Sequence, residues 1–193
     1  GSAKFIVNVL QNEKIKAAVS RLRERDGLIL GICNGFQALI KSGLLPYGEI
    51  KTMKDDDCTL YRNDINRHVS TMVTTRQVTN NSPWLANATV GEVHSIAVSH
   101  GEGKFVCDEA HLKHLIEKGL IAFQYCDLAG NATMDAQYCV NVSTYAIEGI
   151  VSDDGHVLGK LGHSERYVEG VFKNIEGLKK QGIFKNGVNY FKK

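Results

Sequence analysis

The segment LILGICNGFQ places one cysteine, Cys33, between a short apolar run and a helix-forming stretch. The run at residues 28–32 predicts a strand buried on both faces, and residues 34–41 predict a helix. Cys33 therefore falls on a tight strand-to-helix turn, with Gly31 and Gly35 two positions away on either side. This is the pattern of a nucleophile elbow with cysteine in place of serine, because the strained turn needs small neighbours. A small structural cysteine is the alternative, and the strand–turn–helix context favours the nucleophile.

The predicted helix acts on Cys33 through its N-terminal end. Free backbone N–H groups and the positive end of the helix dipole face the sulfur and favour the thiolate, which is the reactive form. The backbone N–H of Asn34 is placed to donate to an oxyanion formed on the substrate. We therefore expect Cys33 to be the most electrophile-reactive of the five cysteines at neutral pH.

A thiol nucleophile needs a base, and seven histidines are available. His163 follows the predicted strand at residues 157–161, and Glu165 lies two residues further along. Residues two apart in an extended segment point to the same side, so Glu165 can bind the ring of His163, fix its tautomer and stabilise its charged form. The sequence thus predicts a triad of Cys33, His163 and Glu165, and we expect His163 to lie close to Cys33.

A third unusual segment is VSHGEG at residues 98–103, in which two glycines frame a histidine and a glutamate. Such a tight loop can hold polar groups at a site. His94, His100 and Glu102 can also be interpreted as metal ligands. Their spacing matches no known zinc pattern, so we predict no metal site.

The elements around these segments alternate between helix and strand at the front of the chain, where Asn12 can cap a helix that runs to Arg25. The remaining predicted elements are strands at residues 59–65, 68–78, 91–99, 104–107 and 120–126, a helix from Asp108 to Lys118, a hairpin of residues 145–151 and 156–161, and a last helix at residues 167–180. Helices and strands in front with antiparallel strands behind predict an α/β sheet that carries an added antiparallel β portion.

The composition is that of one ordinary globular domain over residues 1–193, with 43% hydrophobic and 23% charged residues. Lys and Arg number 23 against 21 Asp and Glu, and this balance argues against a nucleic-acid-binding protein. No apolar run approaches the roughly 18 residues of a membrane span. An odd number of cysteines without a CxxC pair argues against a disulfide framework and favours a reducing, cytoplasmic environment.

Three segments together resemble the glutaminase domains of class I (triad) glutamine amidotransferases, and more narrowly the glutaminase of phosphoribosylformylglycinamidine synthases. They are GICNGFQ at residues 31–37, AVSHGEG at residues 97–103 and HSER at residues 163–166. Asn34 adds discrimination, because many other class I members carry a different residue after the cysteine. The resemblance extends over residues 3–167 and implies a flavodoxin-like parallel sheet flanked by helices.

The resemblance also implies an activity. Cys33 attacks the side-chain amide of glutamine and forms a thioester, which releases ammonia. His163, oriented by Glu165, moves the protons, and water then frees glutamate. The ammonia passes to an ATP-dependent synthetase domain or subunit, which converts formylglycinamide ribonucleotide into formylglycinamidine ribonucleotide in purine synthesis.

Further implications concern binding. Gln37 matches a position that helps to hold glutamine in this class, and Ser99 and His100 match a loop near that site. The family needs no cofactor in this domain, while ATP and Mg²⁺ belong to the synthetase portion of the parent enzyme. Glutamine and the synthetase are the expected partners, with neither nucleic acid nor membrane.

The sequence departs from the family pattern in three places. The family has a strand–helix–strand portion ahead of this chain's first residue, ending in a glycine-rich loop that supplies the second oxyanion N–H. We therefore expect an N-terminally truncated, partial domain with an uncovered sheet side, little glutaminase activity of its own and a tendency to self-associate. Ser164 stands where the family usually has proline, and residues 141–144 replace a longer segment.

Two other interpretations remain beside the glutaminase. One is a γ-glutamyl hydrolase of similar fold, which keeps the triad and changes the substrate. The other is a non-catalytic docking fragment that retains these residues without a complete site. Asn34 and residues 99–103 favour the glutaminase over the hydrolase.

Overall fold

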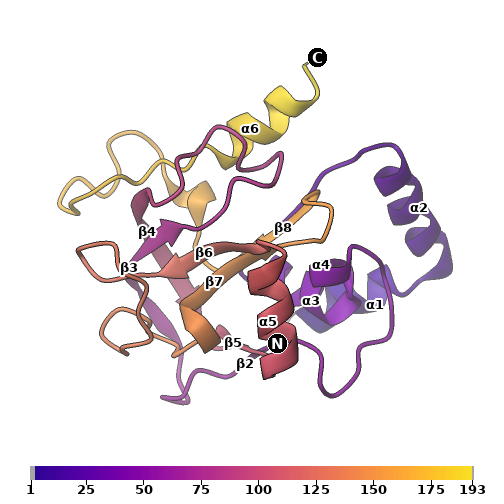
Figure 1. Ribbon diagram of the computed structural model, residues 1–193, viewed down its shortest axis with the longest axis horizontal. Coiled ribbons are helices and arrows are strands. Elements are labelled where there is room, and N and C mark those ends of the chain that lie inside the picture. The colour runs from indigo at the N-terminus through magenta and orange to yellow at the C-terminus, as the bar shows by residue number, and fades with distance from the viewer. Residues whose placement is uncertain (1–2, 193) are drawn as a thin grey trace.

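A six-stranded mixed sheet with strand order β1-β8-β7-β6-β3-β4 runs through the computed structural model, which describes residues 3–192 (Figure 1). Gly1, Ser2 and Lys193 of the expected domain lie outside the described residues. The sheet strands are β1 (Ile29–Ile32), β3 (Val69–Gln77), β4 (Val93–His100), β6 (Ile121–Tyr125), β7 (Ile147–Val151) and β8 (Val157–Lys160), and a second sheet pairs β2 (Thr59–Tyr61) with β5 (Lys104–Val106).

The helices are α1 (Ala3–Leu10), α2 (Glu13–Glu24), α3 (Asn34–Ser42), α4 (Leu44–Tyr47), α5 (Glu109–Glu117) and α6 (Ile183–Tyr190), with short 3₁₀ turns η1 (Thr144–Ala146) and η2 (Ser164–Arg166). Figure 1 shows α1, α3 and α4 grouped together, with α2 further out. The main core lies where α3 packs on β1 and β8, and Phe36 of α3 stacks on Phe105 of β5 with ring centroids 6.4 Å apart.

The α/β class expected from the sequence is confirmed, and the antiparallel strands continue the same sheet. β1 pairs in parallel with β8, from Ile29 opposite Val157 to Ile32 opposite Lys160, whereas the other strand-to-strand pairings described in this sheet are antiparallel. Among the described residues β1 is an edge strand. For this reason Ile29 and Ile32 are half-buried, where the sequence predicted a strand buried on both faces.

Local sequence signals account for most element boundaries. The Asn12 side chain accepts a hydrogen bond from the backbone N–H of Lys14 and begins α2, as predicted. Asp108 caps α5 in the same manner through the N–H of His111. Gly43 ends α3 in the left-handed conformation at φ 85°.

The helix predicted at residues 167–180 is wrong. Gly170 and Gly177 adopt φ values of 87° and 85°, which no helix interior tolerates. The segment instead lies along the outer edge of β4, where the N–H of Ser95 donates to the carbonyl of Leu178 at 2.7 Å. The last helix begins only at Ile183.

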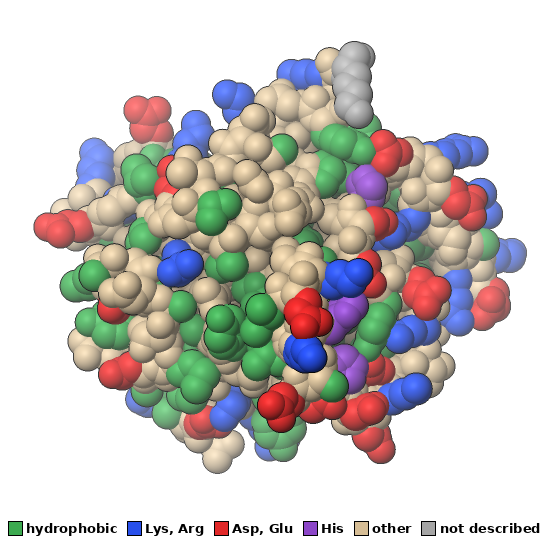
Figure 2. Space-filling view, in the orientation of Figure 1, with side chains coloured by type: hydrophobic (Ala, Val, Ile, Leu, Met, Phe, Trp, Pro, Cys, Tyr) green, Lys and Arg blue, Asp and Glu red, His purple; other side chains and the backbone are tan. Residues whose placement is uncertain are grey.

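The surface mixes charges of both signs. On the face seen in Figure 2, acidic and basic side chains are interspersed, in agreement with the formal net charge of +2. Within residues 3–192, no helix is long and apolar enough to cross a bilayer.

Candidate active site

Cys33 occupies a strained turn between β1 and α3. Its backbone has φ 52° and ψ −104°, a region that residues with a β-carbon rarely adopt. The turn is held by the N–H of Cys33, which donates to the carbonyl of Lys160 at 2.8 Å. A β-carbon on Gly31 would lie 2.4 Å from Leu39 and 2.7 Å from the backbone of Gly35, so Gly31 is required by close approach. Gly35 itself faces open space, and the expectation that it must be small for the same reason is not supported.

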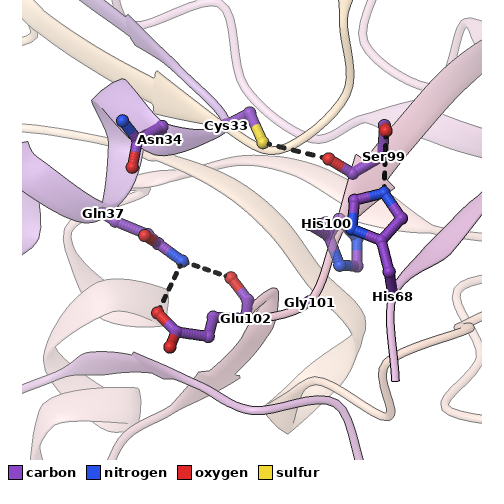
Figure 3. Close-up of a pocket in the computed structure, with 8 residues that line it drawn as sticks. All are labelled: Cys33, Asn34, Gln37, His68, Ser99, His100, Gly101 and Glu102. Carbon is purple, nitrogen blue, oxygen red and sulfur yellow. Dashed lines mark hydrogen bonds between the residues drawn. The ribbon is translucent and has the colours of Figure 1, made fainter. Parts of the chain in front are cut away.

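A cavity of about 350 Å³ opens in front of this turn (Figure 3). Seven of the residues that line it belong to the two segments that the sequence analysis singled out, namely Cys33, Asn34, Gln37, Ser99, His100, Gly101 and Glu102. His68 completes the lining. The thiol points at the wall formed by β4, where Sγ of Cys33 donates to the carbonyl of Ser99 at 3.5 Å.

His163 reaches the same edge of β4 as Cys33. Its backbone N–H donates to the carbonyl of Ala97 at 2.8 Å, two residues before the carbonyl that accepts from Cys33. Its ring Nδ1 lies 2.5 Å from Oε1 of Glu165. The other ring nitrogen, Nε2, is buried and has no hydrogen-bond partner within the described part of the chain. His163 is thus held by a carboxylate on one side and carries an unused nitrogen on the other.

The resting state of Cys33 differs from the expectation. Burial raises the pKa of the Cys33 thiol, and the backbone N–H of Asn34 and the charge of Arg166 lower it only in part. The hydrogen bond to Ser99 agrees, because only a protonated sulfur donates to a carbonyl oxygen. The helix start therefore does not make Cys33 a thiolate, and a base must remove its proton when it reacts.

Acidity alone also does not single out Cys33 among the cysteines. The thiol of Cys58 donates to Cys107 and lowers the pKa of Cys107, which makes Cys107 the competitor for simple alkylation. We expect iodoacetamide to label Cys107 alongside Cys33, and a diazoketone analogue of glutamine to label Cys33 alone, because the cavity holds the analogue. Peptide mapping after brief treatment measures both. Analogue labelling elsewhere than Cys33 contradicts the assignment of the cavity.

Gln37 and His100 hold the wall of the cavity. Gln37 Nε2 donates to the carbonyl of Glu102 at 2.5 Å and so fixes the 101–102 loop (Figure 3). Nδ1 of His100 lies 3.1 Å from Oδ1 of Asn63, which also accepts from the N–H of Gly103. Burial lowers the pKa of His100 to about 4, so its ring is neutral at pH 7. The structure therefore gives these two side chains contacts to the loop, and any contact to glutamine stays a prediction.

His68 is a lining residue that the sequence analysis missed. Its Nε2 lies 3.0 Å from Oγ of Ser99. Nothing in the local pattern signals this, because only the β3–β4 register, with Val69 opposite His100, brings residue 68 to the cavity. The sequence analysis also missed Asn63. This residue lies between strands and reaches the site only by binding the folded 100–103 loop.

We expect His68→Ala to raise the KM for glutamine about 3- to 10-fold with a smaller change in kcat. The substitution removes one hydrogen bond from Ser99 in the cavity wall, a contact of about 0.5–1.5 kcal/mol. Steady-state glutamate release measures the effect. His114→Ala is the matched control, since His114 bonds Asp153 on the exposed side of α5. An unchanged KM in His68→Ala shows that His68 has no part in binding.

The metal interpretation of His94, His100 and Glu102 finds no support in the geometry. His94 pairs with Glu92 at 3.3 Å, and His100 binds Asn63. In residues 3–192, no three His, Cys, Asp or Glu side chains gather in a way that holds a metal ion.

A thiol on a strained strand-to-helix turn of an α/β sheet, with a carboxylate-bound histidine on the same sheet edge, is the arrangement of the cysteine-dependent amidotransferases and hydrolases. Comparison with known proteins narrows this class. Residues 1–191 match the family described as the CobB/CobQ-like glutamine amidotransferase domain. The chain belongs to that family.

Individual relatives point to one branch of it. Two curated proteins named phosphoribosylformylglycinamidine synthase subunit PurQ, from Rhodopseudomonas palustris and Bradyrhizobium diazoefficiens, are 34% and 33% identical over 175 and 167 residues. These matches cover 91% and 86% of this chain and 68% and 65% of the relatives, so the chain spans about two thirds of their length.

A solved structure gives the same result. The structure of PurLQS from Thermotoga maritima matches with a TM-score of 0.67 at 26% identity, and covers 98% of this chain and 71% of that one. The resemblance to the glutaminase of phosphoribosylformylglycinamidine synthases is thereby confirmed.

Proposed function

We propose that the chain is the glutaminase portion of a phosphoribosylformylglycinamidine synthase, which hydrolyses glutamine to glutamate and ammonia through a thioester on Cys33. The observation that carries the proposal is the elbow thiol of Cys33 together with His163, which contacts the same edge of β4, has its Nδ1 next to Glu165 and has a buried Nε2 without a partner in the described residues. The PurQ relatives support the choice of glutamine amidotransferase chemistry.

The first half-reaction forms the thioester. Sγ of Cys33 attacks the side-chain amide carbon of glutamine while Nε2 of His163 takes the thiol proton. Glu165 stabilises the imidazolium that results. The carbonyl oxygen of the substrate becomes an oxyanion, and the backbone N–H of Asn34, which already lies close enough to lower the pKa of the thiol, donates to it. The tetrahedral intermediate collapses, and the leaving nitrogen takes the proton back from His163 and departs as ammonia.

The second half-reaction restores the enzyme. His163 removes a proton from water, and the hydroxide attacks the thioester carbonyl. The same Asn34 N–H stabilises the second oxyanion. The C–S bond then breaks, glutamate leaves, and the proton on His163 returns to Sγ of Cys33. Over the whole cycle the enzyme returns to its starting state, and the net reaction is the hydrolysis of one amide.

The proposed destination of the ammonia is a synthetase domain or subunit that aminates formylglycinamide ribonucleotide with ATP and Mg²⁺. These cofactors belong to the synthetase, and we assign none to this chain. The name of the Thermotoga maritima assembly, PurLQS, supports a complex in which a PurQ-like chain works with other subunits. All five cysteines are free thiols, which agrees with a reducing, cytoplasmic location.

The proposal is tested by comparing substrates and by trapping the intermediate. Glutamate release is measured with glutamine and with γ-glutamyl peptides, in the presence of the synthetase partner, and the mass of the Cys33 peptide is followed after the diazoketone analogue. We expect a strong preference for glutamine and one adduct on Cys33. A preference for γ-glutamyl peptides supports the hydrolase instead. The absence of both turnover and a Cys33 adduct supports a docking fragment.

We also propose that residues 1–193 associate with a second copy of themselves. β1 has one unpaired edge within the described residues, and α1 exposes Phe5 (76%) and Val9 (58%). We expect Phe5→Glu to lower the sedimentation-average mass toward that of a monomer, because a charge disfavours apolar association. Phe191→Glu, which changes an exposed phenylalanine near the other terminus, is the control. A monomeric wild-type chain contradicts the proposal.

A further inference from the structure

Two buried ions lie next to the loop that carries His163. Glu148 is on β7 and Lys160 ends β8, and both side chains are 0% exposed. Nζ of Lys160 lies 3.3 Å from Oε1 of Glu148 and 5.2 Å from the centroid of the Phe123 ring. The pair is therefore enclosed in the protein interior, where each ion has lost its hydration.

Both ions bind the backbone of Gly162. Nζ of Lys160 donates to the Gly162 carbonyl at 2.7 Å, and the Gly162 N–H donates to Oε1 of Glu148. The fit is close, because a β-carbon on Gly162 would lie 2.8 Å from Oε1 of Glu148 and 3.0 Å from Nζ of Lys160. The peptide group between Gly162 and His163 is thus fixed at both ends, its carbonyl by Lys160 and its N–H by the carbonyl of Ala97.

Lys160 also contacts the nucleophile turn. Its backbone carbonyl accepts the Cys33 N–H at 2.8 Å, in the register that places Ile32 opposite Lys160. One residue therefore contacts both halves of the proposed catalytic pair: its backbone holds the turn of Cys33, and its side chain holds the loop of His163.

Packing does not explain why this position is charged. Replacing a buried ion pair by apolar residues of similar volume is often neutral or stabilising, because desolvation offsets the attraction between the ions. Apolar side chains, however, cannot bind the N–H and the carbonyl of Gly162. The ions thus supply a backbone constraint that a hydrophobic pair of the same size lacks.

We propose that Glu148 and Lys160 are positioning residues for the reaction, because they clamp Gly162 and so set the orientation of His163 relative to Cys33. Neither residue touches the cavity, so they act through His163. The inference rests on the proposed glutaminase function, and it predicts that removal of the pair costs rate and leaves substrate binding intact.

The test compares a set of variants in the full chain with its synthetase partner. Lys160→Met leaves a lone buried carboxylate and is expected to destabilise the protein strongly. The double variant Glu148→Leu/Lys160→Met removes both charges at similar volume and keeps the experiment interpretable when the single variant does not fold. Glu148→Gln/Lys160→Met restores an oxygen that accepts from the Gly162 N–H. Arg23→Met breaks the Arg23–Asp154 pair elsewhere and serves as the control.

We expect the apolar double variant to keep a melting temperature near that of the wild type while kcat for glutamine falls about 10- to 100-fold, the effect typical of a small displacement of a catalytic group. The KM for glutamine should stay within about twofold, since the residues that line the cavity are unchanged. The Gln-containing double variant should recover part of the loss. Arg23→Met should leave kcat unchanged.

A second readout does not depend on turnover. The Nδ1 proton of His163, hydrogen-bonded to Glu165, is followed by NMR. We expect a defined signal in wild type and Arg23→Met, and a broadened or shifted one in Glu148→Leu/Lys160→Met. A stable double variant with wild-type kcat and an unchanged His163 signal overturns the positioning role. If the His163 signal differs between the wild type and the double variant but the wild type does not hydrolyse glutamine, the positioning role is supported and the glutaminase proposal is contradicted.

Discussion

Cys33→Ala is expected to abolish glutamine hydrolysis, with a loss in kcat on the order of 10⁴–10⁶ that reflects removal of the nucleophile itself. No other described side chain at the cavity can form the acyl intermediate, because the remaining lining residues offer imidazole, hydroxyl, amide and carboxylate groups without the strained turn. Glutamate release in the presence of the synthetase measures the loss.

Two controls make the Cys33→Ala result specific. Cys107→Ala removes the thiol with the lowered pKa and is expected to leave hydrolysis intact. Ammonium supplied from solution should restore formation of the amidine product by the complex that carries Cys33→Ala, because the synthetase then needs no glutaminase. Residual glutamine hydrolysis above about one hundredth of wild type shows that the reaction does not pass through Cys33.

His163→Ala should lower kcat by about 10²–10⁴-fold, the usual contribution of a positioned general base and acid. The effect is large here because burial raises the pKa of the Cys33 thiol, so nucleophilic attack requires removal of its proton. The KM for glutamine should change little, since His163 does not line the cavity. Steady-state kinetics separates the two constants.

Substitutions of other histidines show whether that loss belongs to His163. His111→Ala removes a ring bound to Asp108 on α5 and is expected to retain wild-type kcat. Glu165→Gln leaves the His163 ring in place with a weaker acceptor at Nδ1. We expect its kcat to lie between that of the wild type and that of His163→Ala. Equal activity of His163→Ala and wild type means that another group takes the thiol proton.

Local patterns predicted the parts of the site that depend on neighbours in sequence. The elbow follows from an apolar strand, a required Gly31 and a helix that starts at Asn34, and all three signals are contiguous. The contact of His163 with Glu165 is present as predicted, but it forms across the 3₁₀ turn η2 and not in the extended segment that the sequence analysis assumed. The Asn12 cap of α2 was predicted by the same local rules.

Features that depend on register were not predicted. The parallel pairing of β1 with β8 brings the Cys33 turn beside the loop of His163, and no local signal encodes that pairing. Glu148 and Lys160 are charged residues within β7 and β8, and no local signal showed that both would be buried. The helix expected at residues 167–180 does not form, because the backbone of this segment pairs with the edge of β4, which is distant in sequence.

The positive φ of Cys33 has a consequence for protein engineering. Holding a residue with a β-carbon in such a conformation costs on the order of 1–3 kcal/mol, a sizeable share of the roughly 5–15 kcal/mol that keeps a typical domain folded. Glycine adopts this conformation freely, so the Cys33→Gly variant should be more stable than the wild type and should not hydrolyse glutamine. A screen for heat tolerance alone would therefore select inactive variants with a substitution at Cys33. Any programme of thermostabilisation must include a selection for glutamine turnover from its first round.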